Sequence, residues 1–211
     1  MTTAQEIIIL LPILLVSISI HEMMHALASF WLGDDTAAEG GRISLNPLKH
    51  IDPYLTIALP AFSLYFLHQL FAIAKPVMVN FHRLKFDEFG GAIVGVVGPL
   101  SNLLIASIGA LIFHLVSPIY GSLTYNVLTV LVELNLVLFT INLIPWPPLD
   151  GSRVLFAFAP EPLQDLMVSI ERAGISVLIL FLIFVLPALW PLINHIINSL
   201  MASLGVPLPV I

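Results

Sequence analysis

Two histidines and a glutamate interrupt a hydrophobic stretch that runs from Ile7 to Trp31. On a helix, the four-residue spacing of His21 and His25 places both imidazoles on one face, one turn apart, where both can reach one metal ion. Glu22 lies beside them and completes the pattern H-E-x-x-H, in which two histidines hold zinc and the glutamate takes a proton from water at the metal. Ionisable groups in a hydrophobic helix must be paired, coordinated or in contact with water. A polar helix face that a neighbouring helix satisfies is the alternative explanation.

A second chemically distinctive stretch follows the apolar residues 125–144. Pro145, Pro147 and Pro148 must break a helix, and broken backbone at membrane depth is tolerated where it is buried in protein or lines a water-filled cavity. Asp150 therefore lies on irregular backbone, which suits a ligand that must reach across to another helix. Because the chain contains no cysteine, any metal must be held by His, Asp or Glu.

The elements that must position these residues are hydrophobic helices. The chain is 59% hydrophobic and only 9% charged, which is typical of a polytopic membrane protein, and its few basic residues form no cluster suited to nucleic acid. Gly91, Gly95 and Gly98 permit close helix contact, so the segment that contains them is predicted to pack centrally. We expect one membrane domain, residues 1–211, that is all-α apart from one short β element and has five to six hydrophobic helices. The expected hydrophobic segments are 7–31, 54–74, 91–116, 125–144, 167–186 and a shorter one, 190–204.

The expected β element follows the first helix. Residues 42–45 alternate polar and apolar side chains after Gly40-Gly41, which suits a short, membrane-associated strand with a free edge. A substrate in extended conformation can add to such an edge, which makes Ile43 and Ser44 candidate substrate contacts. An ordinary loop is an equally open alternative for this stretch.

Charge and parity together predict the topology. If residues 54–74 cross the membrane, the seven Lys and Arg divide five to two, whereas all seven share one face if the segment enters and returns. The positive-inside rule makes that face cytoplasmic. A return also leaves His25 and Asp150 near the same face, as a shared metal requires. We therefore predict a re-entrant segment broken near Pro60, an N-terminus outside, and a metal in the cytoplasmic half of the bilayer.

Three motifs together resemble the site-2 protease family of intramembrane zinc metalloproteases: H-E-x-x-H, Gly-Pro-x-x-Asn at residues 98–102, and Asn-x-x-Pro-x-x-x-Leu-Asp-Gly at residues 142–151. Residues 44–53 and Lys75-Pro76-Val77 further resemble the small prokaryotic branch of that family, which lacks PDZ and CBS domains. The likeness covers the core motifs, residues 17–153, and the C-terminal helices, 163–205, add little to it.

The resemblance implies a role for each matched residue. It implies that His21, His25 and Asp150 hold one Zn²⁺ per chain and that Glu22 is the catalytic base and acid. It places Asn142 where the family contacts substrate or the developing oxyanion, with Asn102 a weaker candidate for the same work. It also implies a prokaryotic cell membrane as the location of this integral, multi-pass protein, whose active site the charges and parity above predict toward the cytoplasm.

The expected function is that of a zinc-dependent endopeptidase that hydrolyses peptide bonds within or near transmembrane segments of membrane proteins, or removes leftover membrane peptides. An amide inside a transmembrane helix is hydrogen-bonded and shielded, so such a substrate must unwind locally. Three alternatives remain open. A multi-pass transporter would usually show paired halves, of which the sequence has no sign. The others are a membrane zincin acting on lipidated C-termini, against which the Leu-Asp-Gly ligand argues, and a protease homologue that has lost activity.

Overall fold

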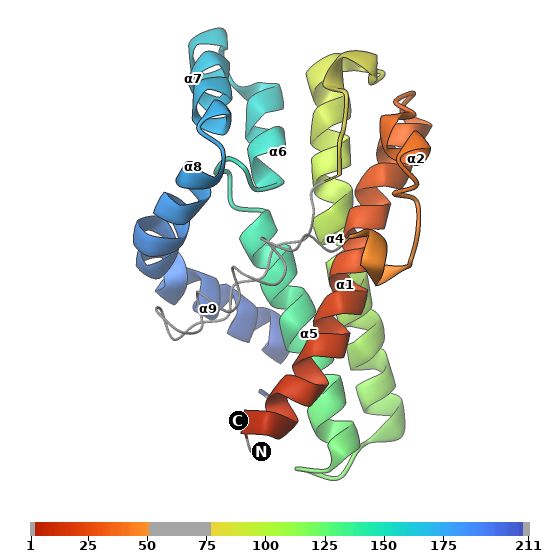
Figure 1. The fold of residues 1–211 in the computed structure, drawn as a ribbon. Helices are drawn as coiled ribbons and strands as arrows, with labels where there is room; N and C mark the ends of the chain where they lie inside the picture. The colour runs from red at the N-terminus through yellow and green to blue at the C-terminus, as the bar shows by residue number, and fades with distance from the viewer. Residues whose placement is uncertain (1–2, 51–76, 209–211) are drawn as a thin grey trace.

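The computed structural model describes residues 3–50 and 77–208, and within these ranges every regular element is helical (Figure 1). Four helical stretches of this part are long and apolar enough to cross a membrane: Ile7–Trp31, Asp87–Val116, Leu123–Asn142 and Ser176–Ser203. The α-helices are α1 (Thr3–Trp31), α2 (Thr36–Glu39), α4 (Asp87–Val116), α5 (Leu123–Asn142), α6 (Gly151–Phe158), α7 (Glu161–Arg172), α8 (Ile175–Leu180) and α9 (Leu186–Ser203). Two 3₁₀ turns, η1 (Pro47–Lys49) and η3 (Phe81–Arg83), and one π-helical turn, η4 (Phe181–Val185), complete the set. The re-entrant segment predicted for residues 54–74 lies outside the described residues.

Helix α4 is the centre of the bundle, as its glycines predicted. It packs against α1, α5 and α6, while α9 covers the far side of α5 (Figure 1). The largest core cluster lies between α4, α5 and the C-terminal helices and includes Val132, Leu136, Phe181 and Met201, each at most 1% exposed. This core fixes the position of α5 along α4. The loop that follows α5 is therefore held at a fixed position along α1.

The end of α1 and the start of α4 lie side by side, so these two helices run antiparallel (Figure 1). The Lys85 N–H donates to the Leu32 carbonyl at 2.8 Å, and the Arg83 guanidinium pairs with Asp35 at 2.6 Å. The buried Asp34 carboxylate accepts from the Asn80 N–H at 2.7 Å and from the hydroxyl of Thr36 at 2.5 Å. The chain thus leaves α1 and enters α4 at the same end of the bundle.

The structure corrects the strand predicted at residues 42–45, which are a loop. Their polar groups are used within the loop instead of in a ladder: the Ser44 N–H donates to the Arg42 carbonyl at 2.9 Å, and His50 Nε2 donates to the Ser44 carbonyl at 2.7 Å. The Arg42 side chain also donates to the Lys49 carbonyl.

The C-terminal boundaries also differ from the predicted segments 167–186 and 190–204. Helix α7 is a separate amphipathic helix whose one buried residue is Met167, and the chain turns after it at Gly174, where φ is +61°. The helix that starts at Ile175 then continues to Ser203 without stopping before Pro187. The π-helical turn shifts the hydrogen-bond register just before Pro187, so the missing N–H of the proline does not end the helix.

Candidate metal centre

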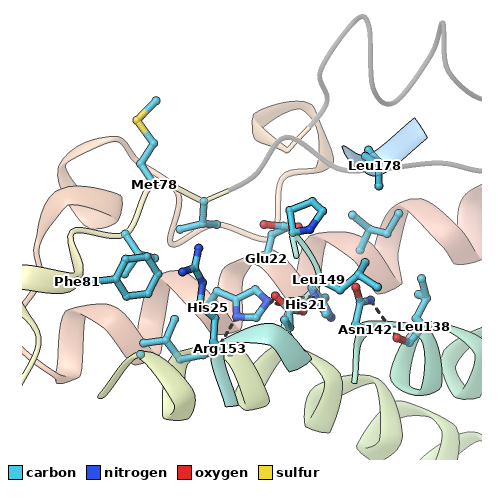
Figure 2. A pocket seen from close by; sticks show the side chains of 18 residues that line it. His21, Glu22, His25, Met78, Phe81, Leu138, Asn142, Leu149, Arg153 and Leu178 are labelled. Carbon is cyan, nitrogen blue, oxygen red and sulfur yellow. Dashed lines mark hydrogen bonds and ion pairs between the residues drawn. The ribbon is translucent and has the colours of Figure 1, made fainter. Parts of the chain in front are cut away.

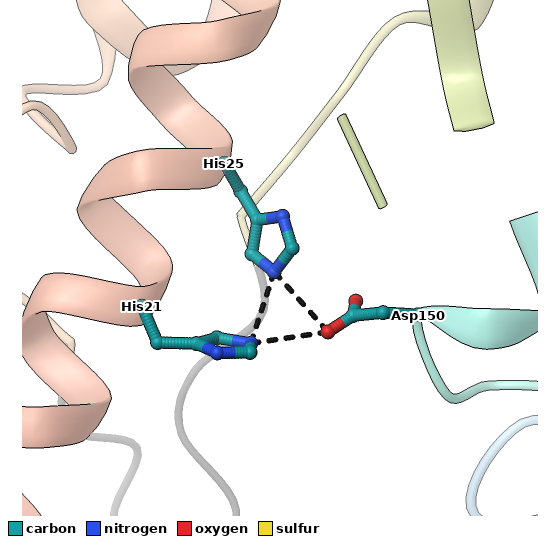
Figure 3. A group of neighbouring side chains, drawn as sticks. All are labelled: His21, His25 and Asp150. Atoms are coloured by element: carbon teal, nitrogen blue, oxygen red, sulfur yellow. Dashed lines mark hydrogen bonds and ion pairs between the residues drawn. The ribbon is translucent and has the colours of Figure 1, made fainter. Parts of the chain in front are cut away.

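Three side chains from distant parts of the chain converge on one point (Figure 3). His21 and His25 project from one face of α1, and Asp150 follows the proline-broken loop after α5 and directly precedes α6. His21 Nε2 lies 3.0 Å from His25 Nε2 and 3.0 Å from Asp150 Oδ2, and His25 Nε2 lies 3.3 Å from the same oxygen. Ligands about 2.0–2.1 Å from a tetrahedral zinc ion lie roughly 3.3 Å apart, so the spacing fits a single ion.

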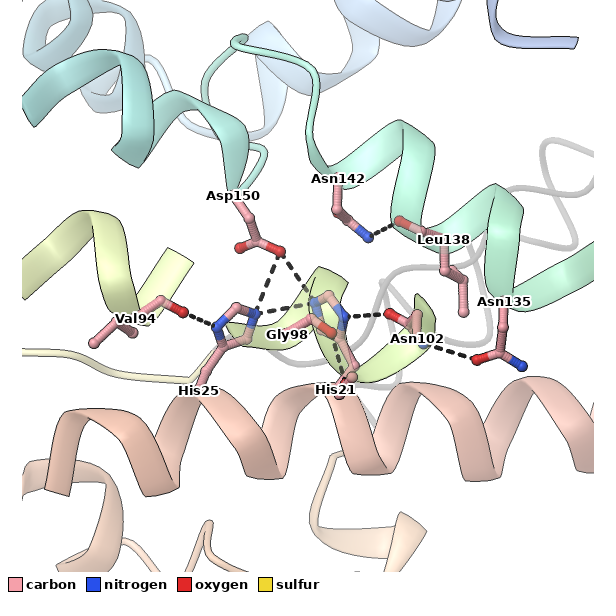
Figure 4. Close-up of polar contacts among 10 residues, drawn as sticks. His21, His25, Val94, Gly98, Asn102, Asn135, Leu138, Asn142 and Asp150 are labelled. Carbon is pink, nitrogen blue, oxygen red and sulfur yellow. Dashed lines mark hydrogen bonds and ion pairs between the residues drawn. The ribbon is translucent and has the colours of Figure 1, made fainter. Parts of the chain in front are cut away.

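The outer nitrogen of each imidazole determines what the inner nitrogen offers. His25 Nδ1 lies 2.7 Å from the Val94 carbonyl oxygen, and His21 Nδ1 lies 2.6 Å from Oδ1 of Asn102 (Figure 4). Carbonyl oxygens only accept, so each Nδ1 carries the hydrogen and each Nε2 presents a lone pair. Two imidazole lone pairs and a carboxylate oxygen therefore face one another, and a bound cation satisfies all three. Two nitrogens and one oxygen without thiolate suit zinc, and three protein ligands leave a fourth position open.

Helix α4 approaches the histidines closely because it has no side chain at Gly98. A Cβ there would collide with the His25 imidazole and lie 2.8 Å from Cε1 of His21. At Gly95, one turn earlier, a Cβ would lie 2.8 Å from the Asp150 carbonyl oxygen. The glycines that make α4 central thus also bring α1 and the Asp150 loop together on its surface.

A cavity of about 560 Å³ opens beside the three converging side chains (Figure 2). Glu22, half-buried, lies on its wall next to His21, and so do Asn142 and Arg153. Residues 77–79 and Phe81 contribute an apolar part of the wall, and residues 77–79 have no regular secondary structure. The Arg153 guanidinium stacks on the Phe81 ring at 4.3 Å and pairs with Glu171 at 3.1 Å, which ties α6 to this wall and to α7.

The remaining sequence-predicted site residues fall in different places. Asn142 lines the cavity; one of its Nδ2 hydrogens is donated to the Leu138 carbonyl at 2.9 Å, which leaves the second for another acceptor. Asn102 is fully buried behind His21 and does not line the cavity. Neither Ile43 nor Ser44 lines it, and Ile43 is 38% exposed on the loop before η1.

The structure joins three residues to the site that the sequence did not place there. Arg153 and Phe81 form the stacked pair on the cavity wall, and no local pattern connects two residues so far apart. Asn135 bonds to Asn102 from α5. The sequence could have indicated Asn135, because it is a polar residue in an apolar helix. It lies two turns before Asn142 and therefore on the same face.

Comparison with known proteins adds a second line of evidence. The chain is 36% identical over 193 residues to a Bacillus subtilis protein named "Putative zinc metalloprotease YwhC", covering 86% of this chain and 84% of that protein. It is 30% identical over 171 residues to "Putative zinc metalloprotease Rip2" of Mycobacterium tuberculosis and 27% identical over 175 residues to the protein of the same name from Mycolicibacterium smegmatis. Each of these two alignments covers 80% of this chain and 64% of the relative. No protein-family model and no solved structure matches the chain.

Proposed function

Because the chain belongs to the site-2 protease family of intramembrane zinc metalloproteases, we propose that His21, His25 and Asp150 hold its zinc ion and that Glu22 moves the protons of peptide hydrolysis. The observation that carries this assignment is the convergence of three acceptor atoms, two imidazole nitrogens and a carboxylate oxygen, within about one zinc coordination sphere. The alternative of a transporter finds no support among the relatives, all of which are named as zinc metalloproteases.

The side chains around the cavity have separate roles in peptide hydrolysis. Zinc, when bound, acts as a Lewis acid that lowers the pKa of a water molecule to about 7. Glu22 accepts the proton of that water and donates it to the amine nitrogen that leaves when the peptide bond breaks. The second Nδ2 hydrogen of Asn142 donates to the peptide carbonyl oxygen as negative charge develops on it.

The shape of the site suits an unwound segment of a membrane protein. The apolar wall at residues 77–79 matches the apolar side chains of transmembrane sequences. Because helical backbone hides its carbonyls in hydrogen bonds, the substrate must present an extended stretch, and helix-breaking residues near the cleaved bond should accelerate cleavage. We therefore assign the substrate contact that the sequence suggested for Ile43 and Ser44 to residues 77–79, which line the cavity.

The protein is an integral membrane protein, and we propose that the zinc site faces the cytoplasm. His25 precedes the end of α1 at Trp31 by six residues, or roughly 9 Å of helix, so the site lies inside the hydrophobic span near that end. Arg83 and Lys85 lie at this end beside α1, and Arg153 stacks on Phe81 of the same segment. The positive-inside rule then favours the cytoplasmic side of the cell membrane for this end.

Removal and return of the metal tests the proposed function. Wild-type protein stripped with a chelator should lose cleavage of a reconstituted single-span substrate and regain it with about one equivalent of zinc. His21→Ala and Asp150→Ala should each bind zinc far more weakly and stay inactive at that zinc concentration. Wild-type zinc occupancy in both variants would refute this ligand set.

A further inference from the structure

Behind His21, on the side away from the cavity, buried polar side chains form a hydrogen-bonded chain through three helices (Figure 4). Asn102 on α4 accepts from His21 Nδ1 at 2.6 Å and donates through Nδ2 to Oδ1 of Asn135 on α5 at 2.9 Å. Asn135 in turn donates to the Ser17 hydroxyl oxygen on α1 at 3.0 Å. Asn102 and Asn135 are fully buried and Ser17 is 1% exposed, so bulk water does not compete for these groups.

The direction of every hydrogen bond in this chain follows from one backbone carbonyl. Asn135 Nδ2 also donates to the Leu131 carbonyl oxygen at 2.9 Å, and this oxygen can only accept. The Asn135 amide therefore cannot be turned around, and its Oδ1 must face Asn102. Asn102 then presents Nδ2 to Asn135 and Oδ1 to His21. His21 must consequently carry its hydrogen on Nδ1 and leave Nε2 free.

We propose that Asn135 is a positioning residue for the metal centre, which acts on His21 through Asn102 and fixes the tautomer that can bind zinc. The inference rests on the proposed function, because it assigns His21 as a zinc ligand. It gives Asn102 a role behind the ligand in place of the substrate contact that the sequence suggested. His25 needs no such support, since its Nδ1 bonds to the backbone carbonyl of Val94, which cannot reverse.

Loss of the Asn135 amide has a specific consequence. Asn102 Nδ2 would be left buried without a partner, which is unfavourable. Rotation of the Asn102 amide gives Nδ2 a new acceptor, His21 Nδ1, and leaves the Oδ1 acceptor facing the apolar side chain instead. That arrangement moves the imidazole hydrogen to Nε2, the atom that must bind the metal. Outer partners of metal-binding histidines are worth about 10–100-fold in metal affinity, and we expect a loss of this size.

The test is zinc affinity, measured by competition with a chromogenic chelator on the purified full chain in detergent. Asn135→Leu, of similar size, should weaken zinc binding about 10–100-fold. Asn126→Leu is the matched control, because Asn126 is a buried amide on the same helix whose side chain, among the described residues, hydrogen-bonds only to the Gly121 carbonyl, at 3.4 Å. Both variants should lower the melting temperature of the metal-stripped protein, but only Asn135→Leu should lower zinc affinity.

The Asn102→Asp background separates orientation from packing. A carboxyl group offers an acceptor oxygen to His21 Nδ1 whichever way it is turned, and in its protonated form its O–H can donate to Asn135 Oδ1, so Asn135 has nothing left to orient. In that background Asn135→Leu should therefore weaken zinc binding less than tenfold. The proposal would be overturned if Asn135→Leu weakened zinc binding equally in the wild-type and Asn102→Asp proteins. It would also be overturned if Asn135→Leu did not weaken zinc binding in the wild-type protein.

A second pair of variants keeps the proposal testable if Asn135→Leu does not fold. Asn102→Leu removes the acceptor itself and should weaken zinc binding at least tenfold, whereas Asn102→Asp should remain within tenfold of wild type. Equal affinities in this pair would also overturn the proposal. The proposed function fails separately: a wild-type protein that binds no zinc would refute it, whereas zinc binding that ignores Asn102 and Asn135 refutes only the positioning role.

Discussion

A single methyl group at Gly98 should weaken the metal centre without unfolding the protein. The Cβ of Gly98→Ala would lie 2.8 Å from Cε1 of His21 and closer still to the His25 imidazole, whereas ordinary contact begins at 3.4 Å. The His21 ring must therefore retreat by roughly 0.6 Å, about three times the 0.2 Å tolerance of a metal–ligand distance. Overpacking of this kind costs about 1–3 kcal/mol. The cost falls on zinc binding, because the rings can rotate away from the methyl group only while the metal is absent.

Converted to affinity, this cost predicts zinc binding about 5- to 150-fold weaker in Gly98→Ala than in wild type. Chelator competition in detergent measures the affinity, and the melting temperature of the metal-stripped protein should change little. Gly109→Ala on the same helix is the control: the atoms nearest its Cβ belong to the side chains of Val132 and Leu131, at 3.1 and 3.2 Å and away from the histidines, so its zinc affinity should be that of wild type. Wild-type affinity in Gly98→Ala would refute the close approach of α4 to the histidines.

Three further predictions concern the cavity, the end of α1 and the membrane topology. Asn142→Ala should slow cleavage about 10²–10³-fold and leave zinc affinity unchanged, because one donor to the developing oxyanion is lost; unchanged kinetics would leave Asn142 only its helix-end contact with Leu138. Burial alone would raise the pKa of Asp34, but hydrogen bonds from Thr36 and the Asn80 N–H hold it below its ordinary value. The ionised Asp34 carboxylate therefore stabilises the folded protein above its unfolded-state pKa, about 4, and this stabilisation is lost as pH falls through its folded-state pKa. Metal-stripped Asp34→Asn should melt lower than metal-stripped wild type at pH 7, the gap should narrow below pH 4, and a gap independent of pH would contradict this. In this cysteine-free chain, single cysteines at Glu39 and Glu88 should react with a membrane-impermeant thiol reagent from one side and a cysteine at Tyr120 from the other; labelling of Glu39→Cys and Glu88→Cys from opposite sides would refute the topology.

Local periodicity predicted the parts of the site that are local in sequence. The four-residue spacing of His21 and His25 on a hydrophobic helix defines their common face, and the structure confirms it. The central position of α4 was predicted in the same way, because Gly91, Gly95 and Gly98 recur at helical spacing and permit close helix contact. Asp150 could be predicted as a partner because three prolines present it on irregular backbone and because the motif around it resembles a known family.

The features that the sequence did not predict depend on which hydrogen-bond partners the groups find in the folded chain, near or distant. The direction of the Asn102 amide is set by the Leu131 carbonyl through Asn135, and no spacing rule within α4 encodes that. Residues 42–45 alternate polar and apolar side chains as a strand does, but the Ser44 backbone groups bond within the loop and not to a second strand. The predicted break between segments 167–186 and 190–204 is absent because the π-helical turn at Phe181–Val185 runs directly into α9.

The central claim is that the zinc ligands and the proton-transfer group are different side chains of one site. Zinc content and cleavage of a reconstituted transmembrane substrate, measured on one preparation of Glu22→Gln, test it most directly. Glu22 is assigned to proton transfer and not to coordination, so this variant should retain about one zinc per chain and lose detectable cleavage. A Glu22→Gln protein that cleaves at the wild-type rate, or one that has lost its zinc, would contradict the assignment.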